Sequence, residues 1–234
     1  SSADGTTYNN FAPSQTTASI NSVVNNAAPG ALQVITYYKA IVQNGVCPNQ
    51  TTNAITVSVD PTSKAGTILT AQKVQQLCIG SPASDVTLQT NVGTIIWKTA
   101  TSIGGTYNTI GGQTAATLPA ANIPTTASGV LYYKAVVTSG VCPSNESDIV
   151  SVQTDALTVA GSISSTSALI CNNSAAPTVS LTGNTGSTIR WQSSTDGTTY
   201  NNFAPSQTGT TINSVVNNAA PGIAQVVTYY KAIV

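Results

Sequence analysis

Few side chains in this sequence could do acid–base chemistry. The 234 residues include seven basic and seven acidic side chains, four cysteines and no histidine. Histidine is the commonest general base, so its absence excludes Ser-His-Asp and Cys-His catalytic arrangements. Glu146 and Asp148 are close enough in sequence for a glycosidase-like pair, but neighbouring acids in a turn are usually solvated. We therefore expect no enzyme activity and no cofactor.

The four cysteines make sense through an internal repeat. Cys78 and Cys171 have equivalent early positions, whereas Cys47 and Cys142 each lie in a late "GVCP" motif. Only the middle repeat has one of each, so we predict a Cys78–Cys142 disulfide that closes one end of a domain. The partners of the other two are expected outside the excerpt. Zinc and free thiols are the alternatives, although no C-x-x-C pair occurs, and a disulfide implies an oxidising compartment.

Two further motifs could bind or react. The Asp-Gly pairs that begin at Asp4 and Asp196 could help to hold Ca²⁺, but between strands Asp-Gly is first of all a hairpin turn, and we favour the turn. The lysine of each "YYKA" motif could form an isopeptide bond with an asparagine. An outward strand lysine that deters edge pairing is the interpretation we favour. These lysines are Lys39, Lys134 and Lys231.

The stretch "TTYNNF" occurs twice and offers an aromatic ring beside two amides. Such groups can hold a sugar, and ordinary strand and loop structure explains the same residues equally well. Both interpretations stay open. The residues of this candidate glycan contact are Tyr8, Asn9, Asn10, Tyr200, Asn201 and Asn202.

A repeat of about 95 residues organises the chain. Residues 1–42 match residues 193–234 at all but seven positions, and "YYKA" and "GVCP" recur in the middle. A unit of this length is the size of one independent domain. We predict the C-terminal part of one repeat at 1–62, a complete repeat at 63–157 and the N-terminal part of a third at 158–234. The linkers are short, so we expect the domains end to end.

Alternation of apolar and polar residues predicts strands. "DVTLQT", "TIIWKT" and "DIVSVQ" each place apolar side chains on one face, which is typical of half-buried antiparallel strands. About seven such strands in one repeat, with a tryptophan on the third, predict an all-β fold of tandem Ig-like antiparallel sandwiches. We expect Trp97, Tyr133 and Trp191 in the cores.

Composition limits the partners. The net charge is zero, which argues against nucleic acid and against an anionic membrane surface. No apolar run approaches the roughly 20 residues of a spanning helix, so we expect no membrane insertion of this segment. Neighbouring repeats of the same chain are expected partners. Abundant hydroxyls and amides favour short-range contact with polysaccharide or an abiotic substratum.

The motifs "W-Q-S-S-x-D-G" and "Y-Y-K-A-x-V…G-V-C-P" resemble the tandem Ig-like repeats of very large surface proteins in gliding and related Bacteroidota, such as gliding-motility adhesins of the SprB type. The resemblance covers the whole chain. It implies type IX secretion, an extracellular location at the cell surface, contact with secretion and motility machinery at the outer membrane, and a role in adhesion or gliding. A passive spacer beside a separate binding or catalytic module, and a self-assembling surface filament, are the alternatives.

Overall fold

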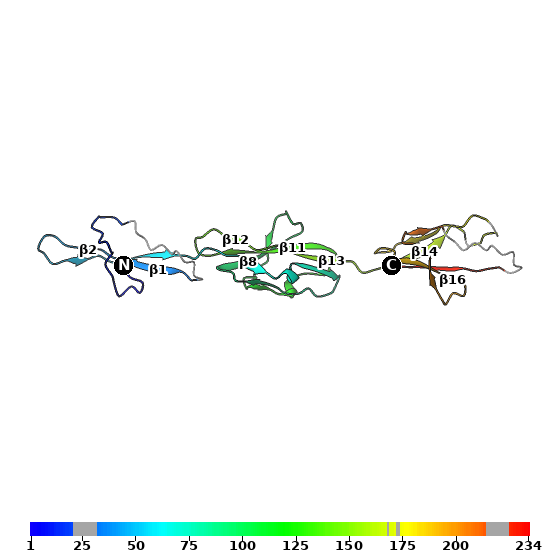
Figure 1. The fold of residues 1–234 in the computed structure, drawn as a ribbon, viewed down its shortest axis with the longest axis horizontal. Coiled ribbons are helices and arrows are strands. Elements are labelled where there is room, and N and C mark those ends of the chain that lie inside the picture. Colours follow the sequence, from blue (N-terminus) through cyan, green and yellow to red (C-terminus); the bar gives the residue numbers. More distant parts are fainter. Residues whose placement is uncertain (21–31, 168, 172–173, 214–224) are drawn as a thin grey trace. The chain divides into compact units, whose positions relative to one another are not determined.

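The computed structural model of the chain describes residues 1–20, 32–167, 169–171, 174–213 and 225–234. These residues form short, mostly antiparallel strands and two single-turn 3-10 helices, η1 (Thr70–Gln72) and η2 (Ala120–Asn122), so the fold is all-β. The chain divides into two compact units, residues 1–154 and 155–234 (Figure 1). Within the described parts, no helix has the length and apolar character needed to span a bilayer.

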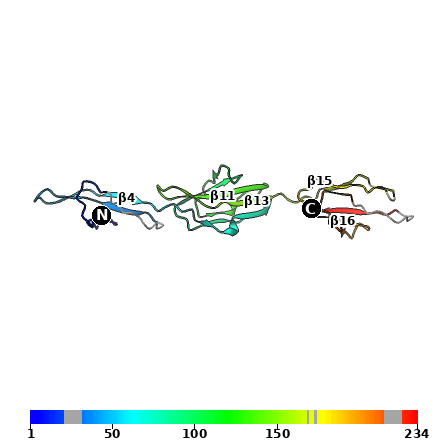
Figure 2. The same cartoon turned by 45° about the horizontal axis from the view of Figure 1, so that its top comes forward.

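We call residues 1–62, 63–157 and 158–234 the first, middle and third segments. The first segment contributes two antiparallel strand pairs (Figure 1, Figure 2). Strand β1 (Val34–Tyr38) pairs with β4 (Ile55–Val59), and β2 (Ile41–Val42) pairs with β3 (Gln50–Thr51). Along β1 the side chains alternate in exposure, and Tyr38 is buried. This is the period of two that places successive side chains on opposite faces of a strand.

The middle segment contains two sheets. The smaller sheet has the antiparallel order β10 (Thr117–Leu118), β7 (Val86–Gln89), β5 (Thr67–Ile68). The larger sheet has the order β6 (Val74–Cys78), β13 (Val150–Asp155), β11 (Gly129–Thr138), β8 (Thr94–Ala100), β9 (Asn108–Thr109), and β12 (Asn145–Glu146) also pairs with β11. Strand β11 is the longest, and both β8 and β13 run antiparallel to it. It therefore organises the larger sheet.

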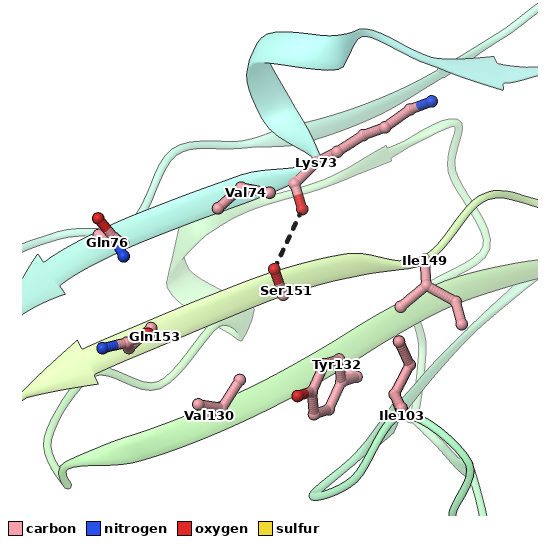
Figure 3. Close-up of a pocket in the computed structure, with 9 residues that line it drawn as sticks. All are labelled: Lys73, Val74, Gln76, Ile103, Val130, Tyr132, Ile149, Ser151 and Gln153. Carbon is pink, nitrogen blue, oxygen red and sulfur yellow. Dashed lines mark hydrogen bonds between the residues drawn. The ribbon is translucent and has the colours of Figure 1, made fainter.

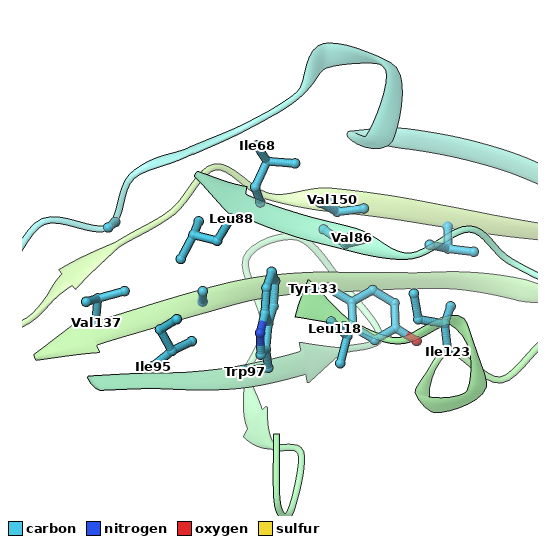
Figure 4. Packing of buried hydrophobic residues seen from close by; sticks show 13 residues of the cluster. Ile68, Val86, Leu88, Ile95, Trp97, Leu118, Ile123, Tyr133, Val137 and Val150 are labelled. Carbon is cyan, nitrogen blue, oxygen red and sulfur yellow. The ribbon is translucent and has the colours of Figure 1, made fainter. Parts of the chain in front are cut away.

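The core of the middle segment lies between these two sheets (Figure 4). Alternate residues of β8, β11 and β13 face alternate residues of β5, β7 and β10, as the apolar patterns of these strands require. The buried cluster consists of Ala65, Ile68, Val86, Leu88, Ile95, Trp97, Leu118, Ile123, Tyr133, Ala135, Val137, Val150 and Val152.

Trp97 lies at the centre of this cluster with none of its surface exposed. Its indole N–H donates a hydrogen bond to the carbonyl of Ala115, at 2.9 Å. A buried tryptophan needs such an acceptor because an unpaired N–H in an apolar core costs free energy. Tyr133, the second residue expected in the core, is also buried.

The third segment repeats this arrangement with fewer strands. One sheet has the order β14 (Ser162–Ser165), β15 (Val179–Thr182), β18 (Thr211–Ile212), and the other β17 (Asn201–Asn202), β16 (Arg190–Ser194), β19 (Tyr229–Ile233). Trp191 is fully buried, and its indole N–H donates to the carbonyl of Gly209 at 2.8 Å. It packs with Val179, Leu181 and Ile212.

Candidate functional site

A hollow lies on the face of β6, β13 and β11 that points away from the core (Figure 3). Its volume is about 290 Å³, at the lower end of the range of small-molecule sites. The apolar part of its wall is formed by Val74, Ile103, Val130, Tyr132 and Ile149, and its polar part by Lys73, Gln76, Ser151 and Gln153. Outward positions of β6, β13 and β11 thus form much of the wall, and Lys73, Ile103 and Ile149 from the adjoining loops complete it.

The polar groups of the hollow are partly engaged with one another and with Asp148. Lys73 Nζ is 2.8 Å from a carboxylate oxygen of Asp148, and the Lys73 carbonyl accepts a 2.8 Å hydrogen bond from the backbone N–H of Ser151. The Ser151 hydroxyl also points to this carbonyl, at 3.5 Å (Figure 3). None of the nine residues of the wall is a histidine or a carboxylate.

The second feature is a tyrosine ring covered by a lysine ammonium, which we call the Tyr–Lys pair. An ammonium over a ring is attracted by the negative face of the π-system. The Nζ-to-centroid distances are 3.8 Å for Lys39 over Tyr8, 4.3 Å for Lys134 over Tyr107 and 4.0 Å for Lys231 over Tyr200. The pair thus occurs once in each of the three segments.

The Tyr–Lys pair of the middle segment has an added carboxylate. Lys134 Nζ is 2.7 Å from Glu146 Oε2. The pKa of the Tyr107 phenol is raised by burial, and the charge of Lys134 opposes that shift. This ammonium is paired with a ring and a carboxylate, an arrangement that differs from the lysine–asparagine bond considered from the sequence.

The candidate glycan contact has exposed amides beside partly buried rings. Asn9, Asn10, Asn201 and Asn202 are exposed, and Tyr8 and Tyr200 are half-buried. Asn201 and Asn202 form β17, and Gln192 on β16 donates a 2.7 Å hydrogen bond to the side-chain oxygen of Asn202. One face of each ring is covered by its lysine. The amides rather than the covered ring faces are available to a ligand.

In each Asp-Gly turn, one carboxylate oxygen of the aspartate accepts several local hydrogen bonds. One oxygen of Asp196 accepts hydrogen bonds from the backbone N–H groups of Thr198 and Thr199, both at 2.8 Å, and from the Ser194 hydroxyl at 2.8 Å. Gly197 has a φ of 73°, which favours glycine. The backbone donors, led by Thr199, hold the pKa of Asp196 well below its ordinary value. The same contacts recur around Asp4.

The remaining acids do not gather into a site. Glu146 pairs with Lys134 and Asp148 with Lys73, so the two carboxylates considered as a glycosidase-like pair are held by different lysines. Among the residues that the structure describes, no three histidine, cysteine, aspartate or glutamate side chains lie together as metal ligands would.

Three consecutive stretches of the chain, residues 1–61, 64–156 and 159–234, match one family model. The chain belongs to this family. Its description is "Domain of unknown function (DUF8696)". Each of the four inner boundaries of the three DUF8696 stretches differs by one residue from the boundary expected from the sequence repeat. No curated protein matches the chain.

The cysteines of the middle DUF8696 repeat lie at opposite ends of β11. The Gly80 N–H donates to the Thr125 carbonyl at 2.9 Å, so Cys78 lies near the start of β11, whereas Cys142 follows its end. A ten-residue strand spans about 33 Å, and a disulfide needs Cα atoms about 4–7 Å apart. The predicted Cys78–Cys142 bond is therefore wrong. All four thiols are free: Cys47, Cys78 and Cys171 are exposed, and Cys142 is partly exposed.

The hollow on the outer face of β6, β13 and β11 was not predicted from the sequence. Its signal is in the strand "GVLYYKAVV", where Val130 and Tyr132 are apolar at positions that alternate with the buried face. Ile103 lies in the loop after β8 and reaches this face from outside the sheet (Figure 3). A strand with apolar side chains on both faces indicates that its outer face is covered or hollowed. Nothing in the sequence of the loop around Ile103 indicates that this residue contacts that face.

Proposed function

We propose that each DUF8696 repeat is an Ig-like β-sandwich. The strand order supports this proposal, because three strands (β10, β7, β5) face a sheet in which β13, β11 and β8 are neighbours. In an Ig-type domain the first, second and fifth strands lie in one sheet, and the third, sixth and seventh in the other. The buried Trp97 on β8 corresponds to the tryptophan of the third Ig strand.

We further propose that the repeats form a non-enzymatic adhesive array of a large cell-surface protein. The observation that carries this proposal is the recurrence, in all three matched segments, of a Tyr–Lys pair. A chain without net charge has little long-range steering, so contact with a surface is short-range. Linked weak sites gain retention by effective concentration, which suits tandem repetition.

The location and partners in this proposal follow from the resemblance to Bacteroidota surface repeats. The array is exported by type IX secretion, stays at the cell surface and contacts polysaccharide or an abiotic substratum during attachment or gliding. Neighbouring repeats and the export and motility machinery are its protein partners.

Retention measured against copy number tests the adhesive array. Fusions of one, two and four copies of the full chain are washed over glass and over agarose, and retention is expected to rise more steeply than copy number. The variant Asn201→Ala/Asn202→Ala should lower retention, whereas Asn49→Ala/Asn53→Ala, which removes two other exposed amides, should not. Retention that is flat with copy number would contradict adhesion by these repeats.

A passive spacer is the second candidate, and one observation favours it. Each tyrosine of the Tyr–Lys pairs and the amide of Asn202 already have partners inside their own repeat. Groups engaged in this way stabilise the repeat without binding anything outside it. If the asparagine variants lower the free energy of unfolding but leave retention unchanged, the spacer is the better function.

A further inference from the structure

Cys142 lies against the segment that joins the first repeat to the middle one. Its sulfur is 3.7 Å from the backbone carbonyl oxygen of Asp60. The neighbouring Val141 N–H donates to the Asp60 carboxylate at 3.1 Å, and the Ser139 N–H donates to the buried Ser63 hydroxyl at 2.8 Å. The loop that contains the late cysteine is thus fixed to the end of the preceding repeat.

This contact depends on a glycine. Gly140 has a φ of 49°, and a Cβ built there would overlap the Asp60 carboxylate. The "G-V-C-P" motif therefore combines a residue that permits close approach to the preceding repeat with the cysteine that lies at the contact. The motif occurs again at Gly45–Pro48.

Cys78 lies at the other end of the middle repeat, beside the strand that leaves it. Strands β6 and β13 run in the same direction, as the order of Val74 and Gln76 beside Ser151 and Gln153 shows (Figure 3). The Ser151 N–H donates to the carbonyl of the residue before β6, at 2.8 Å. Both strands then advance together, so Cys78 at the end of β6 is level with the end of β13.

The internal repeat shows how the position of Cys78 corresponds to the contact between Cys142 and Asp60. Asp60 comes directly after β4, and Asp155 is the last residue of β13. The two aspartates are equivalent positions in the repeat of about 95 residues. An early cysteine in a complete preceding repeat would therefore lie one strand away from Asp60, and Cys142 already contacts Asp60. Neighbouring strands are about 4.8 Å apart, which is within the Cα separation of a disulfide.

We propose that the early cysteine of each repeat forms a disulfide with the late cysteine of the repeat that follows it. Two thiols lose two protons and two electrons to a small-molecule disulfide such as oxidised glutathione, which is released as two thiols. Residues 1–46 contain no cysteine, in agreement with the free thiol of Cys142. The bond joins successive domains and leaves no cysteine of a complete inner repeat unpaired.

The proposal is tested by giving the first repeat an early cysteine. A copy of residues 159–192 is joined ahead of Ser1 of the full chain, because residues 1–42 differ from 193–234 at only seven positions. The four native cysteines and the added one give five thiols. After refolding in a mixture of reduced and oxidised glutathione, in which reduced glutathione returns unpartnered cysteines from mixed disulfides to free thiols, we expect three free thiols by thiol titration and, by mass spectrometry, a peptide that links the added cysteine to Cys142.

Any other number of free thiols, or any other link, contradicts the proposal. One free thiol indicates pairing within repeats, five indicate no bond, and a link from the added cysteine to Cys47 also contradicts it. In the lengthened chain, Cys142→Ser should abolish the bond and Cys47→Ser should leave it unchanged. The original chain, oxidised in the same way, should keep its four thiols.

A second extension guards against a misfolded first repeat. Far-UV circular dichroism and a cooperative thermal transition show whether the added strands have folded. If they have not, a copy of residues 64–98, the corresponding part of the middle repeat, replaces the first extension. A folded chain of either kind that lacks the bond to Cys142 contradicts the proposal.

Discussion

In the middle and third segments, a buried tryptophan lies on one strand of an equivalent antiparallel pair. The strands beyond this pair differ between the two segments. Strand β8 pairs with β11 as β16 pairs with β19. In each case the indole N–H donates to a carbonyl 18 residues further along the chain. Beyond β11 the sheet continues with β13 and β6, whereas β19 is the last strand of its sheet in the described part of residues 155–234.

The cores differ accordingly. Among the residues that the structure describes, the middle cluster has thirteen buried apolar residues and the third has four. Val150 and Val152 of β13 are buried in the middle segment, and the third segment has no counterpart of them within the 234 residues. The tryptophan and its acceptor are therefore set by local sequence, whereas the size of the core depends on a strand that follows much later in the repeat.

The largest expected effect comes from supplying that strand. A copy of residues 43–62 joined after Val234 continues the identical "TYYKAIV" of 36–42 and 228–234. Burying two Val- or Ile-sized side chains is worth about 3–6 kcal/mol, and the third segment should gain that much stability. The fluorescence of Trp191 during urea unfolding, in a Trp97→Phe background, measures it.

A matched extension separates core burial from mere added length. In the control copy, Ile55→Asn and Val57→Asn replace the two side chains that correspond to Val150 and Val152. This control should give almost no gain in the free energy of unfolding. Equal gains from both extensions would show that the missing strand is not what distinguishes the two segments.

Removal of the tryptophan from the larger core has the next effect. Trp97→Ala should lower the free energy of unfolding of the middle segment by about 3–5 kcal/mol, because it leaves a cavity. Ile96→Ala, which changes the neighbouring half-exposed side chain, is the control and should cost far less. Hydrogen exchange of the β8 and β11 amides measures both. Similar losses in the two variants would argue against a core centred on Trp97.

Local patterns predicted much of this fold. The alternation in "TIIWKT" places Trp97 in the core, and the repeat places Trp191 in the same role. The position of Cys78, at the opposite end of β11 from Cys142, was not predictable, because the place of β6 beside β13 is a contact between residues more than 70 positions apart. Pairing with a parallel neighbour does not change the alternation of apolar and polar residues in either strand. The end of the middle segment at which Cys78 lies is therefore visible only in the structure.

A smaller difference separates the Tyr–Lys pairs. Lys134 has Glu146 as well as Tyr107, whereas Lys231 lies over Tyr200 without a carboxylate partner among the described residues. Glu146→Gln should lower the stability of the middle segment by less than about 1 kcal/mol, and near 1 M salt should remove the difference. Asp148→Asn, which breaks the other ion pair without a ring, is the matched control. A loss that persists in high salt would show that Glu146 acts through hydrogen bonding.

The smallest expected effect is on the pH dependence of stability, and it differs between the middle and third segments. Backbone donors from Thr199 and Thr198 lower the pKa of Asp196 in the folded state, whereas the corresponding turn of the middle segment has Gly104 and Gly105 and no aspartate. A carboxyl with a depressed folded pKa stabilises fully above its unfolded pKa, about 3.9, and this contribution is lost as the pH falls further.

The third segment should therefore lose stability below about pH 4 through Asp196, and Asp196→Asn should make its stability less dependent on pH in that range. The fluorescence of Trp191 in the Trp97→Phe background gives the free energy of unfolding at each pH. The middle segment, followed by Trp97 in a Trp191→Phe background, should respond identically with and without Asp196→Asn. If the variant leaves the acid dependence of the third segment unchanged, the turn carboxylate is not what couples this segment to pH, even though its hydrogen bonds define the turn.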